Sequence, residues 1–245
     1  MPLLGTRDLV ADESTAPEMT ALDTEAVTVE RVEILQVMYE IASGPMLDLL
    51  PPALHPTIPP TVTWLVFRAP GGPLGAFTLA QTRIGCRAGV RPRGYLLSAV
   101  VDEPAAAESL AARWGYRCRI GDVALKRFHD RVDARVVEGG ETTLACSVLD
   151  PEAISGGDVQ YVAGMHLART PTGSRLVQVD PEYTFHRAER GRPALEAFAA
   201  GRWGDERVAP VHPVSAHVTV ADVTLPRLRY VSRPDVPAIE GTEKL

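Results

Sequence analysis

The stretch GYLLSAVVDEPAAAESLAARWGYRCRIGDV, residues 94–123, decides the fold. Residues 95–101 form an apolar run of strand length that is rich in leucine and valine. The Asp-Glu pair that follows can cap a helix with Pro104 in its first turn, and Gly115 is a natural left-handed helix end. Residues 116–123 then leave as a second strand. The stretch therefore predicts a strand–helix–strand unit.

The composition excludes several classes of protein. The 245 residues are 45% hydrophobic, which is enough for one substantial core. The net charge is -6 and no basic block stands out, so we expect no nucleic-acid partner. No run approaches the roughly 18 apolar residues of a membrane helix, and the N-terminus has no signal-peptide pattern. We therefore expect a cytoplasmic protein without a membrane partner.

The reactive residue types are few. Only Lys126 and Lys244 are lysines, so an imine-forming mechanism has two candidate amines. The three cysteines are widely spaced without a CxxC pair, which indicates neither a disulfide framework nor a zinc site. Gly-rich phosphate loops, HExxH helices and GxSxG elbows are absent from the sequence. We expect no metal and no cofactor.

The remaining chain reads as many short strands with only a few short helices. This pattern predicts an α+β fold, mainly antiparallel β, built as a sheet or barrel. Besides the central helix, short helices are predicted after Ser43 and over residues 193–200. The composition divides the chain into a flexible acidic arm over residues 1–29, a single domain over 30–233 and a polar tail over 234–245.

The order of several motifs resembles the acetoacetate decarboxylase family. The motifs are Tyr39 before LLPPAL (residues 49–54), the PLGAFT hairpin (73–78), the GYL strand, the D-E-P helix ending in a Gly-Tyr pair, and HVTVADVTLPR (217–227). The resemblance covers most of the predicted domain. It implies an acetoacetate decarboxylase-like, cone-shaped antiparallel β-barrel with a few flanking helices, a mostly apolar pocket and a homo-oligomer.

The resemblance fails at the residues that the family uses for catalysis. Family decarboxylases carry two adjacent lysines after the central helix, one of which forms a Schiff base with the substrate. Here Arg117, Cys118 and Arg119 align with that segment, and Cys118 takes the imine-forming position, where a thiol cannot form the imine. The family's arginine and two glutamates align with Glu40, Trp64 and Leu79. We therefore expect a divergent member that is not an acetoacetate decarboxylase.

Glu40 and Arg119 are the main catalytic candidates. Alternation along the first strand places Glu40 beside Ile34 and Met38, and apolar surroundings raise the pKa of a carboxyl group towards neutrality. Glu40 would then move a proton while Arg119 stabilises an enolate-like oxygen. The alternative is a structural ion pair between Glu40 and an arginine such as Arg119 or Arg68.

Cys118 is the third catalytic candidate. Its arginine neighbours would stabilise a thiolate, whereas a solitary cysteine on a strand is otherwise a small buried side chain. The substrate-binding candidates either shape a pocket and stack on a conjugated ligand or pack in the core. They are Tyr39, Trp64, Leu79, Tyr95, Tyr116 and Arg117.

Two functions remain open at this point. The first is a cofactor-independent lyase, isomerase or cyclase that acts on a hydrophobic, carbonyl-containing, polyketide-like metabolite of specialised metabolism without Schiff-base chemistry. Such a pocket would hold a flexible chain in a near-reactive conformation. The second is a non-catalytic barrel that binds or senses a hydrophobic small molecule.

Overall fold

The computed structural model describes residues 3–245. Its α-helices are α1 (Val10–Thr15), α2 (Pro104–Trp114) and α3 (Ala238–Gly241), and its short 3-10 helices are η1 (Gly156–Asp158) and η2 (Ala200–Trp203). The first strands are β1 (Val27–Ile41), β2 (His55–Pro56), β3 (Thr61–Ala69), β4 (Phe77–Ala88), β5 (Arg91–Val101), β6 (Cys118–Ile120), β7 (Asp122–Arg127) and β8 (Arg131–Glu138). The later ones are β9 (Glu141–Ala153), β10 (Gly164–Thr170), β11 (Gly173–Val179), β12 (Glu182–Phe198), β13 (Pro210–Leu225), β14 (Tyr230–Ser232) and β15 (Thr242–Lys244).

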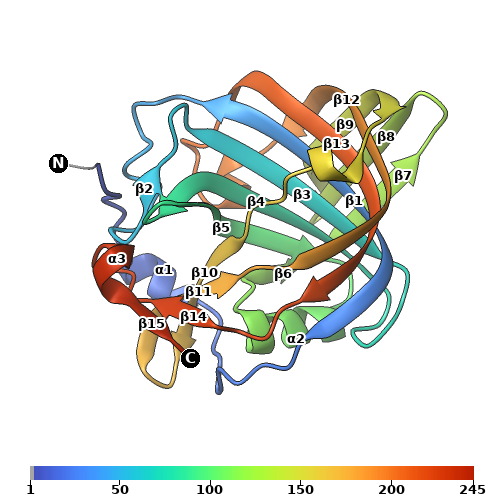
Figure 1. Ribbon diagram of the computed structural model, residues 1–245. Coiled ribbons are helices and arrows are strands. Elements are labelled where there is room, and N and C mark those ends of the chain that lie inside the picture. Colours follow the sequence, from blue (N-terminus) through green and yellow to red (C-terminus); the bar gives the residue numbers. More distant parts are fainter. Residues whose placement is uncertain (1–2) are drawn as a thin grey trace.

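The strands form one curved, mostly antiparallel sheet. Its main order is β15-β14-β11-β10-β5-β4-β3-β1-β13-β12-β9-β8-β7, while β2 pairs with β4 and β6 with β5. Only the β10–β5 and β5–β6 pairs are parallel. The sheet does not close, because β15 and β7 remain its two ends, so the expected barrel is an open one (Figure 1). A bulge in β1 beside Arg31, whose φ is 55°, helps to bend it.

The central strand–helix–strand unit is confirmed. The side chain of Glu103 caps α2 by accepting a hydrogen bond from the Ala105 amide, and Gly115 ends the helix at a φ of 65°. The outgoing strand is divided at Gly121 into β6 and β7. A Cβ at Gly121 would stand 2.8 Å from a methyl group of Val100, so only glycine lets the chain turn this close to β5.

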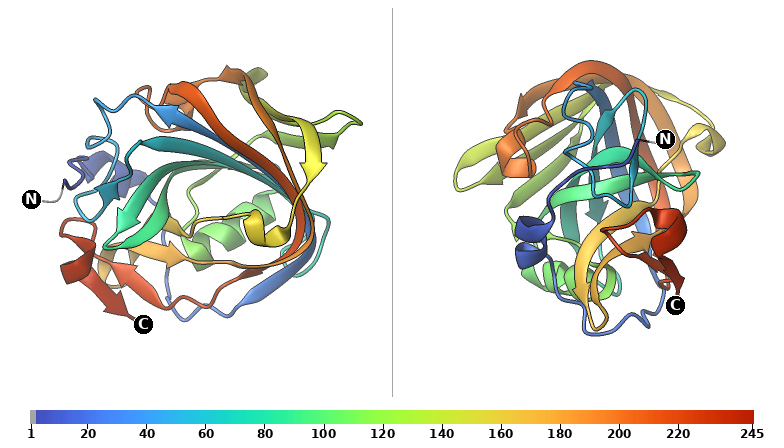
Figure 2. Two further views of the ribbon diagram at one scale, coloured as in Figure 1. Left: turned by 45° about the horizontal axis from the view of Figure 1, so that its top comes forward. Right: turned by 90° about the vertical axis from the view of Figure 1, so that its left-hand side faces the viewer.

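The central strands are buried on both faces. One face of β1, including Leu35 and Val37, belongs to a first core that also contains residues of β7, β8 and β9. The other face, including Ile34, belongs to a second core that contains Leu110 and Trp114 of α2. Figure 2 shows α2 within the curve of the sheet. The near-continuous burial along β3 and β4 follows from this double coverage.

The segment before β1 is part of the folded body rather than a loose arm. Met19 is 1% exposed and lies in the second core, and the Met19 amide donates to the Arg169 carbonyl at 2.8 Å. Asp12 is buried and accepts hydrogen bonds from Arg7 and Arg117. The acidic composition predicted a flexible arm. The prediction is wrong because Asp12 forms ion pairs with arginines inside the protein and apolar residues of the segment are buried. The first two residues of the predicted arm lie outside the described residues.

Two other local predictions are wrong. Residues 193–198 belong to β12, where Pro193 pairs with Val148 and Leu195 with Cys146, because the long ladder to β9 outweighs the helix propensity of this alanine-rich stretch. The segment after Ser43 forms turns instead of a helix. The polar tail expected over residues 234–245 contains α3 and β15, and β15 pairs with β14.

None of the α-helices in residues 3–245 has the length and apolar content needed to cross a lipid bilayer.

Candidate active site

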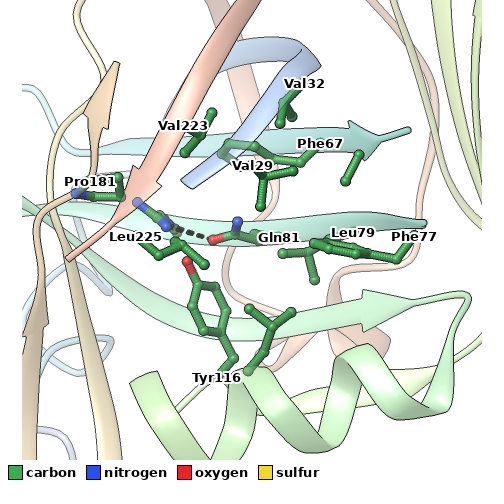
Figure 3. A pocket seen from close by; sticks show the side chains of 13 residues that line it. Val29, Val32, Phe67, Phe77, Leu79, Gln81, Tyr116, Pro181, Val223 and Leu225 are labelled. Carbon is green, nitrogen blue, oxygen red and sulfur yellow. Dashed lines mark hydrogen bonds between the residues drawn. The ribbon is translucent and has the colours of Figure 1, made fainter. Parts of the chain in front are cut away.

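An apolar pocket lies in the second core between β1, β3, β4, β13 and α2. Its cavity volume is about 30 Å³. Its walls are almost entirely aliphatic and aromatic, with polar side chains only from β4 and from the turn after α2 (Figure 3). The lining residues are Val29, Val32, Phe67, Ala69, Phe77, Leu79, Gln81, Arg83, Leu110, Tyr116, Pro181, Val223 and Leu225. Such walls suit a ligand that is largely apolar and carries one polar group.

Arg83 supplies the only formal charge among the residues that line this pocket. Its side chain is 3% exposed, and no carboxylate of residues 3–245 lies within ion-pair distance of it. The guanidinium instead donates from Nε and Nη2 to Oε1 of Gln81 at 2.9 and 2.6 Å, and from Nη1 to the Val162 carbonyl at 3.1 Å. A guanidinium has five N–H groups, so part of its donor capacity remains free.

The polar end of the pocket contains further unmet hydrogen-bonding capacity. Gln81 is fully buried, and its side-chain Nε2 has no hydrogen-bond partner. Gln81 and Arg83 lie two residues apart on β4, so both side chains point to the same face of the sheet. A buried charge and a buried amide without full partners cost free energy unless a ligand completes them.

Tyr116 extends this polar end from the other side. It directly follows the left-handed Gly115, and its hydroxyl points towards Gln81 in Figure 3. Burial raises the pKa of the Tyr116 hydroxyl, although the charge of Arg83 opposes the rise. Tyr183 lies in the same electrostatic surroundings, since burial raises its pKa and Arg83 again opposes the rise. Both phenols are therefore protonated near neutral pH and can donate hydrogen bonds.

His166 packs behind Tyr116 and stays neutral. The two rings meet edge to face at a centroid distance of 4.3 Å, and Nδ1 of His166 lies 2.9 Å from the Trp114 carbonyl. Burial and the nearby charge of Arg83 lower the pKa of His166 to about 3. Because Nδ1 faces a carbonyl, the neutral ring carries its proton there and leaves Nε2 as an unpaired acceptor.

Comparison with known proteins agrees with this architecture. A family model described as "Acetoacetate decarboxylase (ADC)" matches residues 14–234. The chain belongs to the acetoacetate decarboxylase family. No curated protein matches it.

Several solved structures share the fold at low sequence identity. A solved acetoacetate decarboxylase has a TM-score of 0.74 and 18% identity, and the match covers 83% of this chain and 88% of that enzyme. The enzyme from Legionella pneumophila has a TM-score of 0.73 and 17% identity, covering 91% and 95%. The enduracididine biosynthesis enzyme MppR complexed with pyruvate has a TM-score of 0.67 and 18% identity, covering 84% and 90%.

Neither lysine of this family member reaches the pocket. Lys126 on β7 and Lys244 on β15 are both exposed, and neither is among the lining residues. The residues 3–245 also contain no group of three or more His, Cys, Asp or Glu side chains that could hold a metal ion. The polar functional groups that line the pocket are therefore the guanidinium of Arg83, the amide of Gln81 and the phenol of Tyr116.

Three of the residues expected at the site lie at or beside this pocket. Leu79 and Tyr116 line it. Cys118 is the lateral neighbour of Ala99 on β5, and Ala99 is the neighbour of Gln81 on β4, so the three side chains share one face of the sheet. Burial raises the pKa of the Cys118 thiol to about 12, with only partial opposition from Arg119. The thiol is thus protonated near neutral pH, which agrees with the alternative of a small buried side chain and not with that of a thiolate.

Three expected aromatic residues lie in the first core, on the opposite face of the sheet. Trp64 contacts Tyr39 at a ring-centroid distance of 5.7 Å and Phe198 at 4.7 Å. Tyr95 is 3% exposed and belongs to the same core. Because alternate residues of a strand point to opposite faces, these three cannot line the pocket beside Arg83.

The charged candidates are separated from one another. Glu40 lies between Thr61 and His212 near the end of β1 and is not among the pocket residues. Arg119 donates to Glu138 at 2.8 and 3.0 Å and contacts the Trp203 ring at 5.7 Å. Neither reaches the pocket. The ion pair offered as the alternative for Glu40 is not formed either, since Arg119 pairs with Glu138 and Arg68 pairs with Glu33.

Arg117 forms an ion pair with Asp12 at 3.1 Å and so binds the N-terminal segment to the chain just before β6. The expected catalytic and binding sets are therefore not gathered around one cavity.

Sequence reasoning missed Gln81 and Arg83. The signal was present in the stretch LAQTRIGC, residues 79–86, where two polar side chains share one face of an otherwise apolar strand. Alternation identifies that pair, but it does not tell which face encloses a cavity.

Proposed function

We propose that this member of the acetoacetate decarboxylase family is a cofactor-independent lyase, isomerase or cyclase that acts on a hydrophobic carbonyl compound through an enolate-like intermediate. The observation that carries the proposal is Arg83, a buried cation without a carboxylate partner at the polar end of an apolar pocket. Negative charge that develops on a substrate oxygen there is stabilised most strongly, because the surroundings are dry.

Each polar residue has a distinct part in this reaction. The substrate carbonyl oxygen accepts hydrogen bonds from the free N–H groups of Arg83 and from the Tyr116 hydroxyl. Gln81 holds the guanidinium in place through its Oε1. The apolar part of the substrate packs against the aliphatic and aromatic walls, such as Phe67 and Leu79. When a bond at the α-carbon breaks, its electron pair moves to the carbonyl oxygen and is held there as an enolate.

The proposed reaction forms no imine with the protein. Its only amine side chains, Lys126 and Lys244, are exposed and remote from the lining residues. Since no carboxylate lines the pocket either, the α-proton is transferred to water or to a basic group of the substrate itself. This proposal differs from the expectation that Glu40 moves the proton and Arg119 stabilises the enolate oxygen. Here Arg83 stabilises that oxygen.

The test is exchange of α-protons for deuterium in β-keto esters of increasing alkyl length, followed by proton NMR in heavy water. We expect the wild-type protein to accelerate exchange at least about tenfold over buffer and to prefer longer alkyl chains. Arg83→Lys keeps the charge but loses the planar fork, so it should return the rate close to that of buffer. Lys126→Arg is the control and should retain full exchange.

Two results would contradict the proposal. One is equal exchange by the wild-type protein and by Arg83→Lys, with both proteins folded by circular dichroism. The other is a protein adduct trapped by borohydride in the presence of a keto ester, since only an imine is reduced in this way.

A non-catalytic binding role is the second candidate, favoured by the absence of a carboxylate or a basic imidazole among the lining residues. In that case the keto esters bind in an Arg83-dependent manner, while their α-protons exchange at the rate of buffer. Calorimetry of the same samples separates the two candidates.

A further inference from the structure

A second, polar cleft adjoins the apolar pocket. Its cavity volume is about 220 Å³, and Pro181 belongs to its wall as well as to the wall of the apolar pocket. The lining residues are Arg91, Gln178, Asp180, Pro181, Glu182, Pro226, Arg227, Arg229 and Tyr230. They come from the start of β5, the end of β11 with the turn to the start of β12, and the segment between β13 and β14 with the first residue of β14.

Three arginines of this cleft have no ion-pair partner. Arg91, Arg227 and Arg229 are exposed, and none of them lies within ion-pair distance of a carboxylate in residues 3–245. Asp180 and Glu182 also line the cleft, so three positive charges face two negative ones. This local excess of positive charge contrasts with the net charge of -6 of the whole chain.

The backbone holds two of these arginines towards the cleft. Leu228 is 3% exposed and lies in the second core, so it anchors the segment between β13 and β14. Arg227 and Arg229 flank this anchor and both line the cleft. The Arg229 carbonyl accepts a hydrogen bond from the Leu245 amide at 3.0 Å, which fixes the far end of the segment.

A fourth arginine, Arg93, follows Arg91 by two residues on β5 and interacts electrostatically with the cleft residues Asp180 and Arg91. Arg93 is only 7% exposed, and its Nε has no hydrogen-bond partner. Its one hydrogen bond goes from Nη1 to the carbonyl of the adjacent Pro92 at 2.9 Å. Burial lowers the pKa of Arg93; the charge of Asp180 from the cleft wall opposes this and that of Arg91 adds to it. Arg93 is therefore a buried cation without an ion-pair partner in residues 3–245, and its positive charge adds to the electrostatic potential of the cleft.

We infer that this cleft binds a phosphate group, and that the phosphate belongs to a ligand whose carbonyl part lies at Arg83. The guanidinium fork of arginine matches two phosphate oxygens at once, and a dianion compensates several arginines better than a carboxylate does. The shared wall at Pro181 places the cleft next to the apolar pocket. The placement of the ligand's carbonyl group at Arg83 rests on the proposed function, whereas the phosphate site is argued from the arginines of the cleft alone.

The test uses the full chain and a double variant, Arg227→Gln with Arg229→Gln. Both side chains are exposed, so the fold should be retained. A matched control, Arg135→Gln with Arg190→Gln, removes the same charge from exposed positions on β8 and β12. Inorganic phosphate and acetate are titrated into each protein at constant ionic strength and followed by NMR.

We expect phosphate to bind the wild-type protein and the control equally, and the double variant at least about tenfold more weakly. Acetate should bind none of them measurably. Equal phosphate affinity in the wild-type protein and the double variant, or no phosphate binding at all, would overturn the inference. Because the double variant retains Arg83, it should keep its affinity for keto esters, which separates this outcome from a failure of the proposed function.

The source of the phosphate is resolved with keto phosphonates that carry spacers of increasing length. If one of them binds more tightly than phosphate and loses affinity in both the double variant and Arg83→Lys, the phosphate is part of the ligand in the pocket. If every phosphonate binds like free phosphate and ignores Arg83→Lys, the cleft binds a separate phosphate and the link to the pocket is wrong.

Discussion

Arg83 and Gln81 form a buried pair on one face of β4, in which Nε and Nη2 of the guanidinium donate to the same oxygen of Gln81 at 2.9 and 2.6 Å. Arg83 is 3% exposed and Gln81 is fully buried. The pair keeps a positive charge inside an apolar pocket without neutralising it. This is the arrangement expected where a ligand brings the negative charge.

Replacement of Gln81 tests this pair. In Gln81→Leu the guanidinium loses the oxygen that accepts two of its three hydrogen bonds, so we expect a loss of about 1–3 kcal/mol in the free energy of unfolding. Urea unfolding measures this loss. Gln81→Glu supplies a carboxylate instead, so it should retain the stability but lower the affinity for keto esters. Unchanged affinity in Gln81→Glu would mean that the charge of Arg83 does not attract the ligand.

The space next to His166 depends on Gly164. A Cβ at position 164 would stand 2.3 Å from Nε2 of His166, which is fully buried. Gly164→Ala should therefore displace the imidazole that supports Tyr116 and destabilise the fold by about 1–3 kcal/mol. At Gly44 nothing lies within 4 Å of the added methyl group, so Gly44→Ala is the control and should leave the melting temperature almost unchanged.

The low pKa of His166 makes stability depend on pH. Its pKa is about 3 in the folded protein against 6.5 as the ordinary value, so below pH 6.5 the unfolded chain binds a proton that the folded chain does not. Stability should fall as the pH falls from about 6.5 towards 3, by up to about 1.4 kcal/mol per pH unit from this group.

Urea unfolding between about pH 7 and pH 5 checks this dependence, because the main carboxylates titrate below that window. His166→Gln should flatten the slope. The pKa of His217 is also lowered by burial, so His217→Gln serves as a comparison and should remove only its own smaller share. An identical slope in the wild-type protein and His166→Gln would show that His166 is accessible to protons when folded.

The thiols should resist alkylation in the folded protein. Burial raises the pKa values of Cys86, Cys118 and Cys146 to about 12, so the thiolate fraction is small near neutral pH. With iodoacetamide at about pH 8, we expect mass spectrometry to show alkylation of each cysteine at less than about one tenth of its rate in guanidinium chloride. Rapid modification of Cys118 in the folded protein would revive its role as a nucleophile.

The N-terminal segment depends on Asp12. Its carboxylate accepts hydrogen bonds from Arg7 and Arg117, and these interactions lower its pKa against the opposing effect of burial. Asp12→Asn removes the charge that Arg7 and Arg117 pair with, so it should loosen the part of the segment around α1, whereas the burial of Met19 and the sheet itself should remain. Limited proteolysis should then cleave before β1 at least about tenfold faster than in the wild-type protein. Asp8→Asn, at an exposed position nearby, is the control.

The local elements of this protein could be predicted from its residues alone. The signals around Pro104 and Gly115 lie within a few residues of what they control, and they fixed α2 and its flanking strands. The order of motifs also identified the family. The alternation of β1 was right as well, since Leu35 and Ile34 lie in different cores.

The location of the pocket could not be predicted from the sequence, because it depends on contacts between distant residues. Both faces of β1 and β4 are buried, so alternation separates Trp64 from Leu79 but does not say which face contains the pocket. The meeting of Arg83 with the Val162 carbonyl joins residues 79 positions apart, and that contact depends on how the sheet curves. Likewise, residues 193–198 became a strand because pairing with β9 is a long-range interaction that outweighs local propensity. Capping residues and alternation therefore predict individual helices and strands, whereas the pocket depends on strand register and on the curvature of the sheet.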